Sequence, residues 1–153
     1  MRKHAAYVIS LAGAVAIAAT ASADSGTRSR LTAVAGEGSG LVKIAPTAHD
    51  VAGPDTFDIQ GTVNVRHLEP NADYKVLRWV DFLPDGNCTG ATPLSLPGDP
   101  TLTTSAGGAG ALHFEISRGA PLVDGVGFDV IWRVVNSGGT AVLQSSCLTV
   151  TVK

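Results

Sequence analysis

A period-two alternation of apolar and polar residues is the feature that most restricts the fold of this chain. Apolar residues alternate with polar ones between residues 57 and 65, where Gly61 takes one position of the apolar series. The same alternation recurs in residues 112–116, 128–135 and 148–152. No stretch of the mature sequence has the sustained 3.6 period of an amphipathic helix. Short alternating segments bury one face and expose the other, so the sequence predicts an all-β, antiparallel domain.

Turn-forming residues separate these segments, notably in residues 84–87 (Pro-Asp-Gly-Asn), 105–110 and 136–139. We therefore expect strands within residues 41–45, 57–65, 74–83, 102–104, 112–116, 128–135 and 140–152. The most apolar of them, residues 74–83, has apolar side chains on both faces and should be a central strand. Residues 89–100 are rich in Pro and Gly and should hold a short edge strand. About seven strands favour a two-sheet antiparallel sandwich over an eight-stranded barrel.

The apolar positions of the alternating segments define the expected core. We expect it to contain Phe57, Ile59, Val63, Val65, Val76, Val80, Leu112, Phe114, Ile116, Phe128, Val130, Trp132, Val134, Leu148 and Val150. A core that takes up these side chains leaves no deep apolar pocket of the kind that binds small molecules.

Residues 1–23 have the features of a cleavable secretory signal peptide. A short basic start is followed by residues 5–19, which are apolar and rich in alanine. Ala21 and Ala23 then present the small side chains that signal peptidase accepts, so Asp24 should be the first mature residue. A membrane anchor is the alternative, but a spanning helix needs about 20 apolar residues. No second apolar segment follows, so we expect no membrane span after cleavage and a secreted or periplasmic product.

Removal of residues 1–23 leaves 130 of the 153 residues, enough for one domain with a core. We expect residues 24–40, which lack periodicity, to form a flexible leader, and residues 41–153 to form the β-sandwich domain. Loss of two basic residues takes the formal net charge from −2 to −4. The basic residues lie far apart in sequence, and Arg28 and Arg30 are their one close pair. Nucleic acid requires a basic patch, so we expect no nucleic-acid partner.

Cys88 and Cys147 are the two cysteines of the chain and lie 59 residues apart. In an exported protein an isolated pair is most simply a disulfide bond, with free thiols as the alternative. A metal site would need His or acidic residues at ligand spacing beside each cysteine, and neither cysteine has them.

The segment Leu68–Val76 reads Leu-Glu-Pro-Asn-Ala-Asp-Tyr-Lys-Val. It resembles the Leu-x-Pro-x-x-x-Tyr-x-Val corner of fibronectin type III and related immunoglobulin-like domains. The resemblance implies an immunoglobulin-like sandwich in which the Tyr74 hydroxyl bonds back to the chain across the corner. It covers nine residues, and almost 80 residues follow it, whereas the family places this corner late in the domain. Residues 87–90 and 103–104 also look like segments of small exported bacterial β-domains, a likeness that brings no active site.

Histidines and carboxylates are the remaining candidates for metal sites. His49, His67 and His113 are isolated in sequence, and three separate strands would have to converge for them to bind one metal. Acidic residues gather around two turns, as calcium loops require, although without the spacing of an EF-hand. The first turn has Asp50, Asp55 and Asp58, and the second has Asp81, Asp85 and Asn87. Asp and Asn are also ordinary turn residues, so we assign no metal or cofactor.

The sequence also lacks a recognisable catalytic motif. The chain has no Gly-x-Ser-x-Gly elbow, and nothing selects two carboxylates as a glycosidase pair. Trp79 and Trp132 could form a sugar-binding platform, but their apolar strands favour core packing. We therefore expect a non-catalytic binding or structural module whose partner is a protein, a glycan or an envelope polymer. The alternative is a small exported enzyme, metal-dependent or not, with a site built from loops.

Overall fold

The computed structural model describes residues 27–49, 56–89, 92–119 and 125–152, and this part of the chain forms ten strands and no helix. The strands are β1 (Thr27–Ala33), β2 (Ser39–His49), β3 (Thr56–Arg66), β4 (Asp73–Asp81), β5 (Thr92–Ser95), β6 (Thr101–Thr103), β7 (Gly110–Gly119), β8 (Gly127–Asn136), β9 (Ala141–Ser145) and β10 (Leu148–Thr151). Every strand pairing is antiparallel, so the expected all-β antiparallel class is confirmed. No helix in the described ranges is long and apolar enough to cross a membrane.

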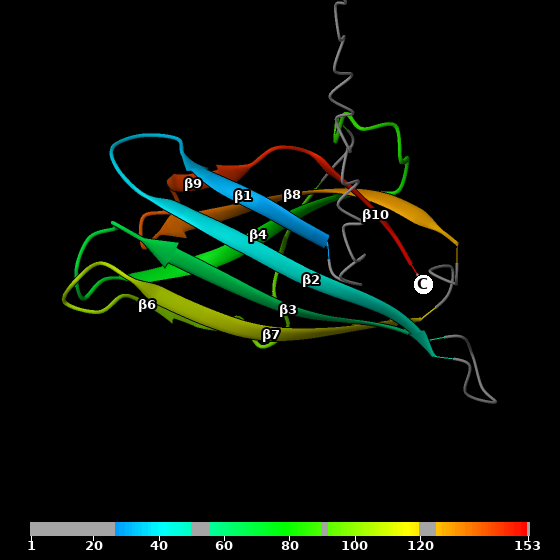
Figure 1. The fold of residues 1–153 in the computed structure, drawn as a ribbon, viewed down its shortest axis with the longest axis horizontal. Helices are drawn as coiled ribbons and strands as arrows, with labels where there is room; N and C mark the ends of the chain where they lie inside the picture. Colours follow the sequence, from blue (N-terminus) through cyan, green and yellow to red (C-terminus); the bar gives the residue numbers. More distant parts are fainter. Residues whose placement is uncertain (1–26, 50–55, 90–91, 120–124, 153) are drawn as a thin grey trace, which may run out of the picture.

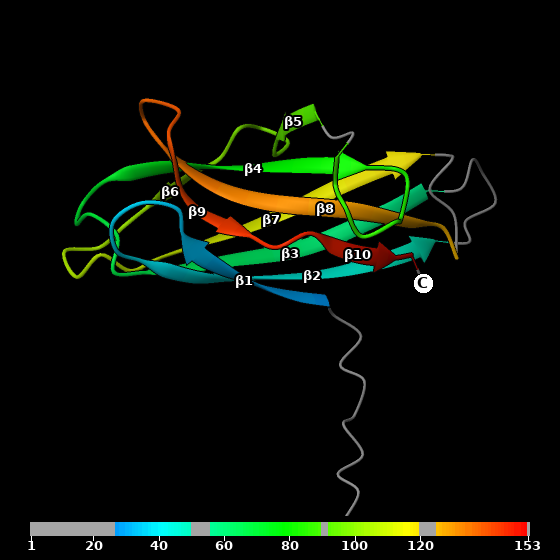
Figure 2. The ribbon, with the colours of Figure 1, turned by 90° about the horizontal axis from the view of Figure 1, so that it is seen from above.

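The strands form a single sheet in the order β5-β4-β8-β9-β1-β2-β3-β7, with β6 beside β4 and β10 beside β8. The sheet curls into a half-barrel, in which β1, β2, β3 and β7 form one wall and β4 and β8 face them (Figures 1 and 2). β9 joins the walls, because it pairs with β8 and also with residues 31–33 of β1. The expected division into two sheets is not confirmed. The expected count of about seven strands was too low, since β1 was missed and the last segment is divided into β9 and β10.

The interpretation of residues 24–40 as a flexible leader was wrong for the part that the structure describes. Residues 27–33 form β1, which pairs with β2 from Thr27 opposite Ile44 to Thr32 opposite Ser39. Ser29 and Leu31 are buried within β1, and Arg28, Arg30 and Thr32, which alternate with them, are exposed. One large apolar residue is enough to hold β1 in the sheet, because β1 pairs with a neighbouring strand on each side. The sequence did not predict this strand because the Gly- and Ser-rich composition of residues 24–40 concealed its alternation.

The core lies between the two walls and largely follows the expected positions. Of the fifteen residues predicted for it, twelve are buried, and Val80 and Leu148 are partly buried against them. The side chain of Phe57 lies outside the described residues. Additional buried side chains come from segments that the alternation did not single out, including Leu31, Val42, Ile44, Leu68, Tyr74, Leu96, Leu102 and Leu143.

Two core positions show how the interior is filled. Gly61 lies opposite Phe114 in the β3–β7 pairing, and the phenyl ring occupies the space that a side chain at Gly61 would need. A Cβ at Gly61 would lie 2.1 Å from Phe114 Cζ. Arg78 is 4% exposed and lies opposite Trp132 of β8, so a charged residue takes an inward position of β4 that the sequence did not mark.

Candidate functional site

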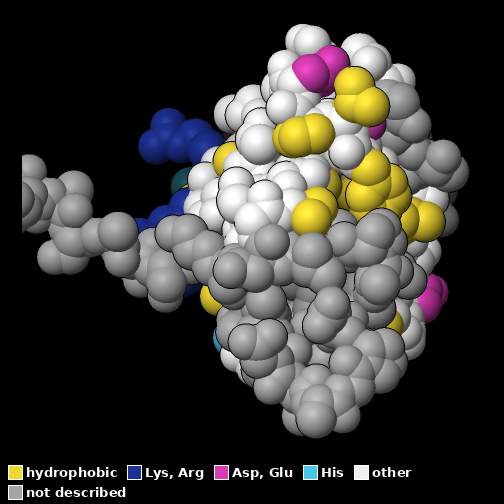
Figure 3. Space-filling model, turned by 90° about the vertical axis from the view of Figure 1, so that its right-hand side faces the viewer, with side chains coloured by type: hydrophobic (Ala, Val, Ile, Leu, Met, Phe, Trp, Pro, Cys, Tyr) yellow, Lys and Arg dark blue, Asp and Glu magenta, His cyan; other side chains and the backbone are white. Residues whose placement is uncertain are grey.

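The outer surface of the wall formed by β1, β2, β3 and β7 gathers polar residues that are far apart in sequence. Residues paired across antiparallel strands project from the same side of a sheet. The register produces four such rows: Arg28, Lys43, Thr62 and His113; Arg30, Leu41, Asn64 and Ala111; Thr32, Ser39 and Arg66; and Ala45, Gln60 and Glu115. We call these fourteen residues the basic face, because Arg28, Arg30, Lys43 and Arg66 share it. β1 and β2 lie at the front of Figure 1. In Figure 3 this front is at the left, where Lys and Arg side chains (dark blue) project from the surface.

Two hollows open on the basic face. The first has a volume of about 900 Å³ and contains Arg30 and Arg66 at its sides, with Thr32, Ser39, Leu41 and Asn64 among its lining residues. The second has a volume of about 530 Å³, and Lys43, Ala45, Gln60, Thr62, His113 and Glu115 contribute to its lining. Both linings combine cationic side chains with amides and hydroxyls, and the second also contains the Glu115 carboxylate. Such surfaces can hold anionic and hydrogen-bonding groups of a ligand.

The described basic side chains outside this face have partners within the protein. Lys75 Nζ forms an ion pair with Asp99, at 2.8 Å. The Arg133 guanidinium lies over the Trp79 ring, 4.3 Å from its centroid, and its Nε donates to Gln144 Oε1 at 2.5 Å. Of the described Lys and Arg residues, Arg28, Arg30 and Arg66 are exposed, and all three lie on the basic face, although the chain as a whole is mildly acidic.

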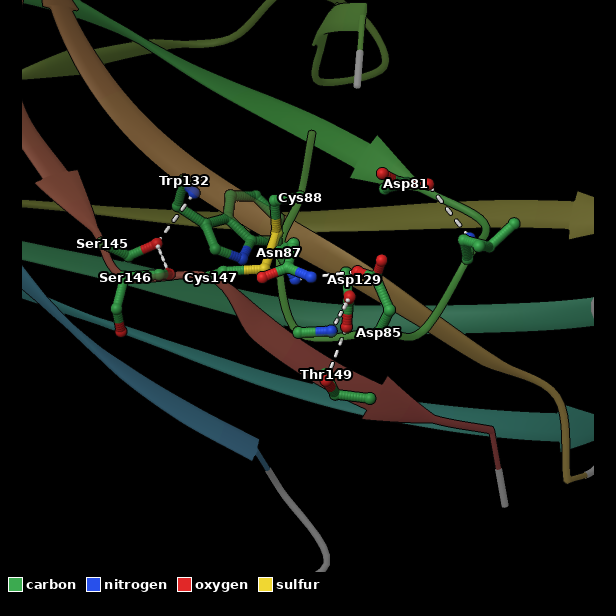
Figure 4. The surroundings of a disulfide bond; sticks show 12 residues. Asp81, Asp85, Asn87, Cys88, Asp129, Trp132, Ser145, Ser146, Cys147 and Thr149 are labelled. Carbon is green, nitrogen blue, oxygen red and sulfur yellow. Dashed lines mark hydrogen bonds between the residues drawn. A yellow bond between two sulfur atoms is a disulfide. The ribbon is translucent and has the colours of Figure 1, made fainter. Parts of the chain in front are cut away.

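Cys88 and Cys147 form a disulfide bond, as their isolation in the sequence predicted. The S–S distance is 2.00 Å and the Cα atoms lie 5.8 Å apart. Cys88 belongs to the loop after β4, and Cys147 lies between β9 and β10, so the bond fixes this loop to the last strands (Figure 4). The alternative of free thiols is excluded.

Asp129 lies beside the disulfide bond and has no exposed surface (Figure 4). Its carboxylate accepts hydrogen bonds from the Gly86 backbone N–H at 2.6 Å and from the Thr149 hydroxyl at 2.5 Å. A carboxylate oxygen and the two sulfur atoms lie within 4.8 Å of one another, a spacing that metal ligands can have. The sulfurs are bonded to each other and present no thiolate, so we interpret this group as structural.

Tyr74 forms the hydrogen bond that the corner resemblance implies. Its hydroxyl accepts from the Glu69 backbone N–H at 3.2 Å, and the residue is 4% exposed. Thr104 supports the same corner, because its hydroxyl accepts from the Ala72 N–H at 3.0 Å and donates to the Glu69 carbonyl at 2.6 Å. The corner is a local structure and does not by itself establish a family.

The structure does not bring the described histidines together. His113 is exposed on β7, with Nδ1 3.1 Å from the Thr62 hydroxyl oxygen. His67 is exposed in the turn after β3, and the side chain of His49 lies outside the described residues.

The described carboxylates of the two turns hold local structure. Asp81 accepts from the Leu83 N–H at 3.0 Å, and Asp85 accepts from the Asn87 N–H at 2.9 Å, as turn aspartates do. Asp58, at the other turn, accepts a hydrogen bond from the Ser117 hydroxyl. The other two acidic residues of the first turn, at positions 50 and 55, lie outside the described residues.

The favoured interpretation, core packing of both tryptophans, is confirmed for Trp132 but not for Trp79, and the two do not form a joint platform. Trp132 is 1% exposed and packs in the core, with its ring centroid 5.3 Å from that of Phe114. Trp79 lies on the outer surface of β4 beneath Arg133. Consecutive residues of a strand point to opposite sides, and the β4–β8 register therefore separates the two indoles.

The chain matches no known protein-family model and no curated protein.

Proposed function

We propose that this chain is an exported, non-catalytic binding module and that the basic face is its ligand-binding surface. The observation that carries this proposal is the register of β1, β2, β3 and β7, which gathers four basic side chains around two hollows on one wall. The surface is broad, open and polar. Small molecules favour enclosed apolar pockets, so such a surface suits a large, polar partner.

The roles of the reactive side chains support a non-catalytic module. Both cysteines are consumed by the disulfide bond, and Asp81, Asp85 and Asp129 accept hydrogen bonds that hold the loop after β4. The alternative hypothesis is a small exported enzyme, metal-dependent or not, with a site built from loops. Elemental analysis of the purified mature protein tests the metal-dependent form, because a stoichiometric metal would favour the enzyme.

Export is part of the proposal. The signal-like residues 1–23, which lie outside the described residues, and the disulfide bond both support a secreted or periplasmic location. N-terminal sequencing of the exported product should begin at Asp24. A product that retains Met1 would contradict the proposed processing.

We also propose that the curled sheet is a variant of the immunoglobulin-like two-sheet sandwich. The Tyr74 corner and the two antiparallel walls that face each other across one core support this relation. The variant differs where β9 pairs with β1. NMR couplings across hydrogen bonds between β1 and β9 are expected; their absence would indicate two separate sheets.

Binding to envelope fractions tests the proposed function. Polysaccharide, protein and lipid fractions from the exporting cell are immobilised, and binding of the mature protein is measured for two variants that each lose one positive charge. Arg66→Gln alters the basic face, and Lys75→Gln alters the opposite wall. We expect Arg66→Gln to weaken binding about tenfold, which corresponds to about 1.4 kcal/mol, with Lys75→Gln close to wild type. Equal effects of the two variants would contradict the proposal.

A further inference from the structure

We infer that the ligand of the basic face is a linear acidic polysaccharide whose carboxylate groups are held by Arg30 and Arg66. This inference rests on the proposed function, because it names the ligand class of the same face.

Arg30 and Arg66 are placed to bind two acid groups of one extended chain. Arg30 belongs to β1 and Arg66 to β3, with β2 between them, and both line the first hollow. Neighbouring strands lie about 4.8 Å apart, so β1 and β3 are separated by about 10 Å. The two-residue offset along the strands adds about 7 Å, which places the two Cα atoms about 12 Å apart. Each guanidinium presents a planar fork that binds a carboxylate through two hydrogen bonds.

The groups between and beyond the arginines suit sugar hydroxyls. The first hollow contributes the Asn64 amide and the hydroxyls of Thr32 and Ser39, and the second contributes Gln60 and Thr62. Amides and hydroxyls both donate and accept hydrogen bonds, as sugar hydroxyls do. A ligand that carries hydroxyls as well as carboxylates therefore matches more of the surface than a simple anion.

The two hollows lie on neighbouring rows of the basic face. The four rows of the basic face follow one another along the strands at intervals of two residues, so they extend over about 20 Å. Lys43, in the second hollow, provides a further cation along these rows. A linear polymer can occupy both hollows, whereas a single small anion would fill part of one.

The composition of the face argues against a folded protein or a lipid surface. Protein interfaces contain an apolar centre with aromatic anchors, and peripheral membrane binding uses apolar side chains that enter the bilayer. Among the fourteen residues of the basic face, Leu41 is the one large apolar side chain, and it is 40% exposed. No Phe, Tyr or Trp occurs among them.

Calorimetry of the mature protein with an oligogalacturonate of defined length tests the inference. The same oligomer with methyl-esterified carboxylates keeps the sugars and removes the charges. Polyglutamate and vesicles of anionic phospholipid provide the acidic-peptide and lipid alternatives. The Arg30→Gln/Arg66→Gln variant is compared with Lys75→Gln/Arg133→Gln, which removes two positive charges from the opposite wall.

We expect the mature protein to bind the free oligogalacturonate and to lose at least tenfold in affinity when the carboxylates are esterified. The Arg30→Gln/Arg66→Gln variant should lose about a hundredfold in affinity for the free oligomer. The affinity of the control variant should change less than threefold. Equal binding of the esterified oligomer, or stronger binding of polyglutamate or vesicles, would overturn the polysaccharide assignment. If a ligand is found but the Arg30/Arg66 variant binds it like wild type, the basic face is not the binding surface and the proposed function fails as well.

Discussion

Replacing both Cys88 and Cys147 with alanine removes a cross-link between residues 59 positions apart. The chain-entropy relation gives a loop of this size an entropy difference of about 14 cal/mol/K, or about 4 kcal/mol at 25 °C. Without the bond, Asp129 of β8 still connects the two segments, because it accepts hydrogen bonds from the Gly86 N–H in the loop and from the Thr149 hydroxyl of β10. We therefore expect the free energy of unfolding to fall by about 4 kcal/mol, a large part of the 5–15 kcal/mol that is usual for a domain.

Urea unfolding of the mature protein, followed by tryptophan fluorescence, measures this loss. Trp132 is fully packed in the core, so its emission should report global unfolding. The m-value should rise in the double variant, because an unlinked denatured chain exposes more surface. Wild-type protein reduced with a dithiol serves as the control and should agree with the variant. A loss below about 1 kcal/mol in both samples would refute the reasoning that the bond acts on the denatured chain.

Three further substitutions test the packing of the described structure, each by urea unfolding. Gly61→Ala places a methyl group against the Phe114 ring and should cost about 1–3 kcal/mol; unchanged stability would show that the ring moves freely. Tyr74→Phe removes the hydroxyl that accepts from the Glu69 N–H and should cost about 1 kcal/mol, so a neutral result would mean that the corner bond adds nothing. Phe82→Ser alters a side chain that is 63% exposed and should change stability by less than about 0.5 kcal/mol; a loss as large as that of Gly61→Ala would contradict its exposure.

The strands and most of the core could be predicted because burial of one sheet face imposes a two-residue period on the sequence. Residues 57–65 show this period clearly, and their inward positions are the buried ones wherever the side chains are described. The inward positions of residues 128–135 are buried as well, although Asp129 and Val135 on the other face are also buried. The disulfide bond followed from the isolation of its two cysteines. These predictions needed only the local alternation of residues or the fact that the chain has just two cysteines.

The basic face could not be predicted, because it depends on which strands are neighbours. Arg30 and Arg66 are 36 positions apart, and β2 brings them to one side of the sheet. The clue in the sequence was the alternation of residues 28–32, Arg-Ser-Arg-Leu-Thr, which predicts a strand with two outward arginines. Its single large apolar residue made this signal weak, and the pairing of β1 with β9 provides the stability that composition did not reveal.

NMR mapping of the ligand footprint tests the central claim most directly. Isotope-labelled mature protein is titrated with the envelope fraction that it binds, and changes in backbone amide shifts are assigned to residues. The account predicts that the largest changes cluster at Leu41, Lys43, Thr62 and Asn64 on the basic face. Changes that cluster instead on the outer surface of β4 and β8, around Trp79, would contradict it.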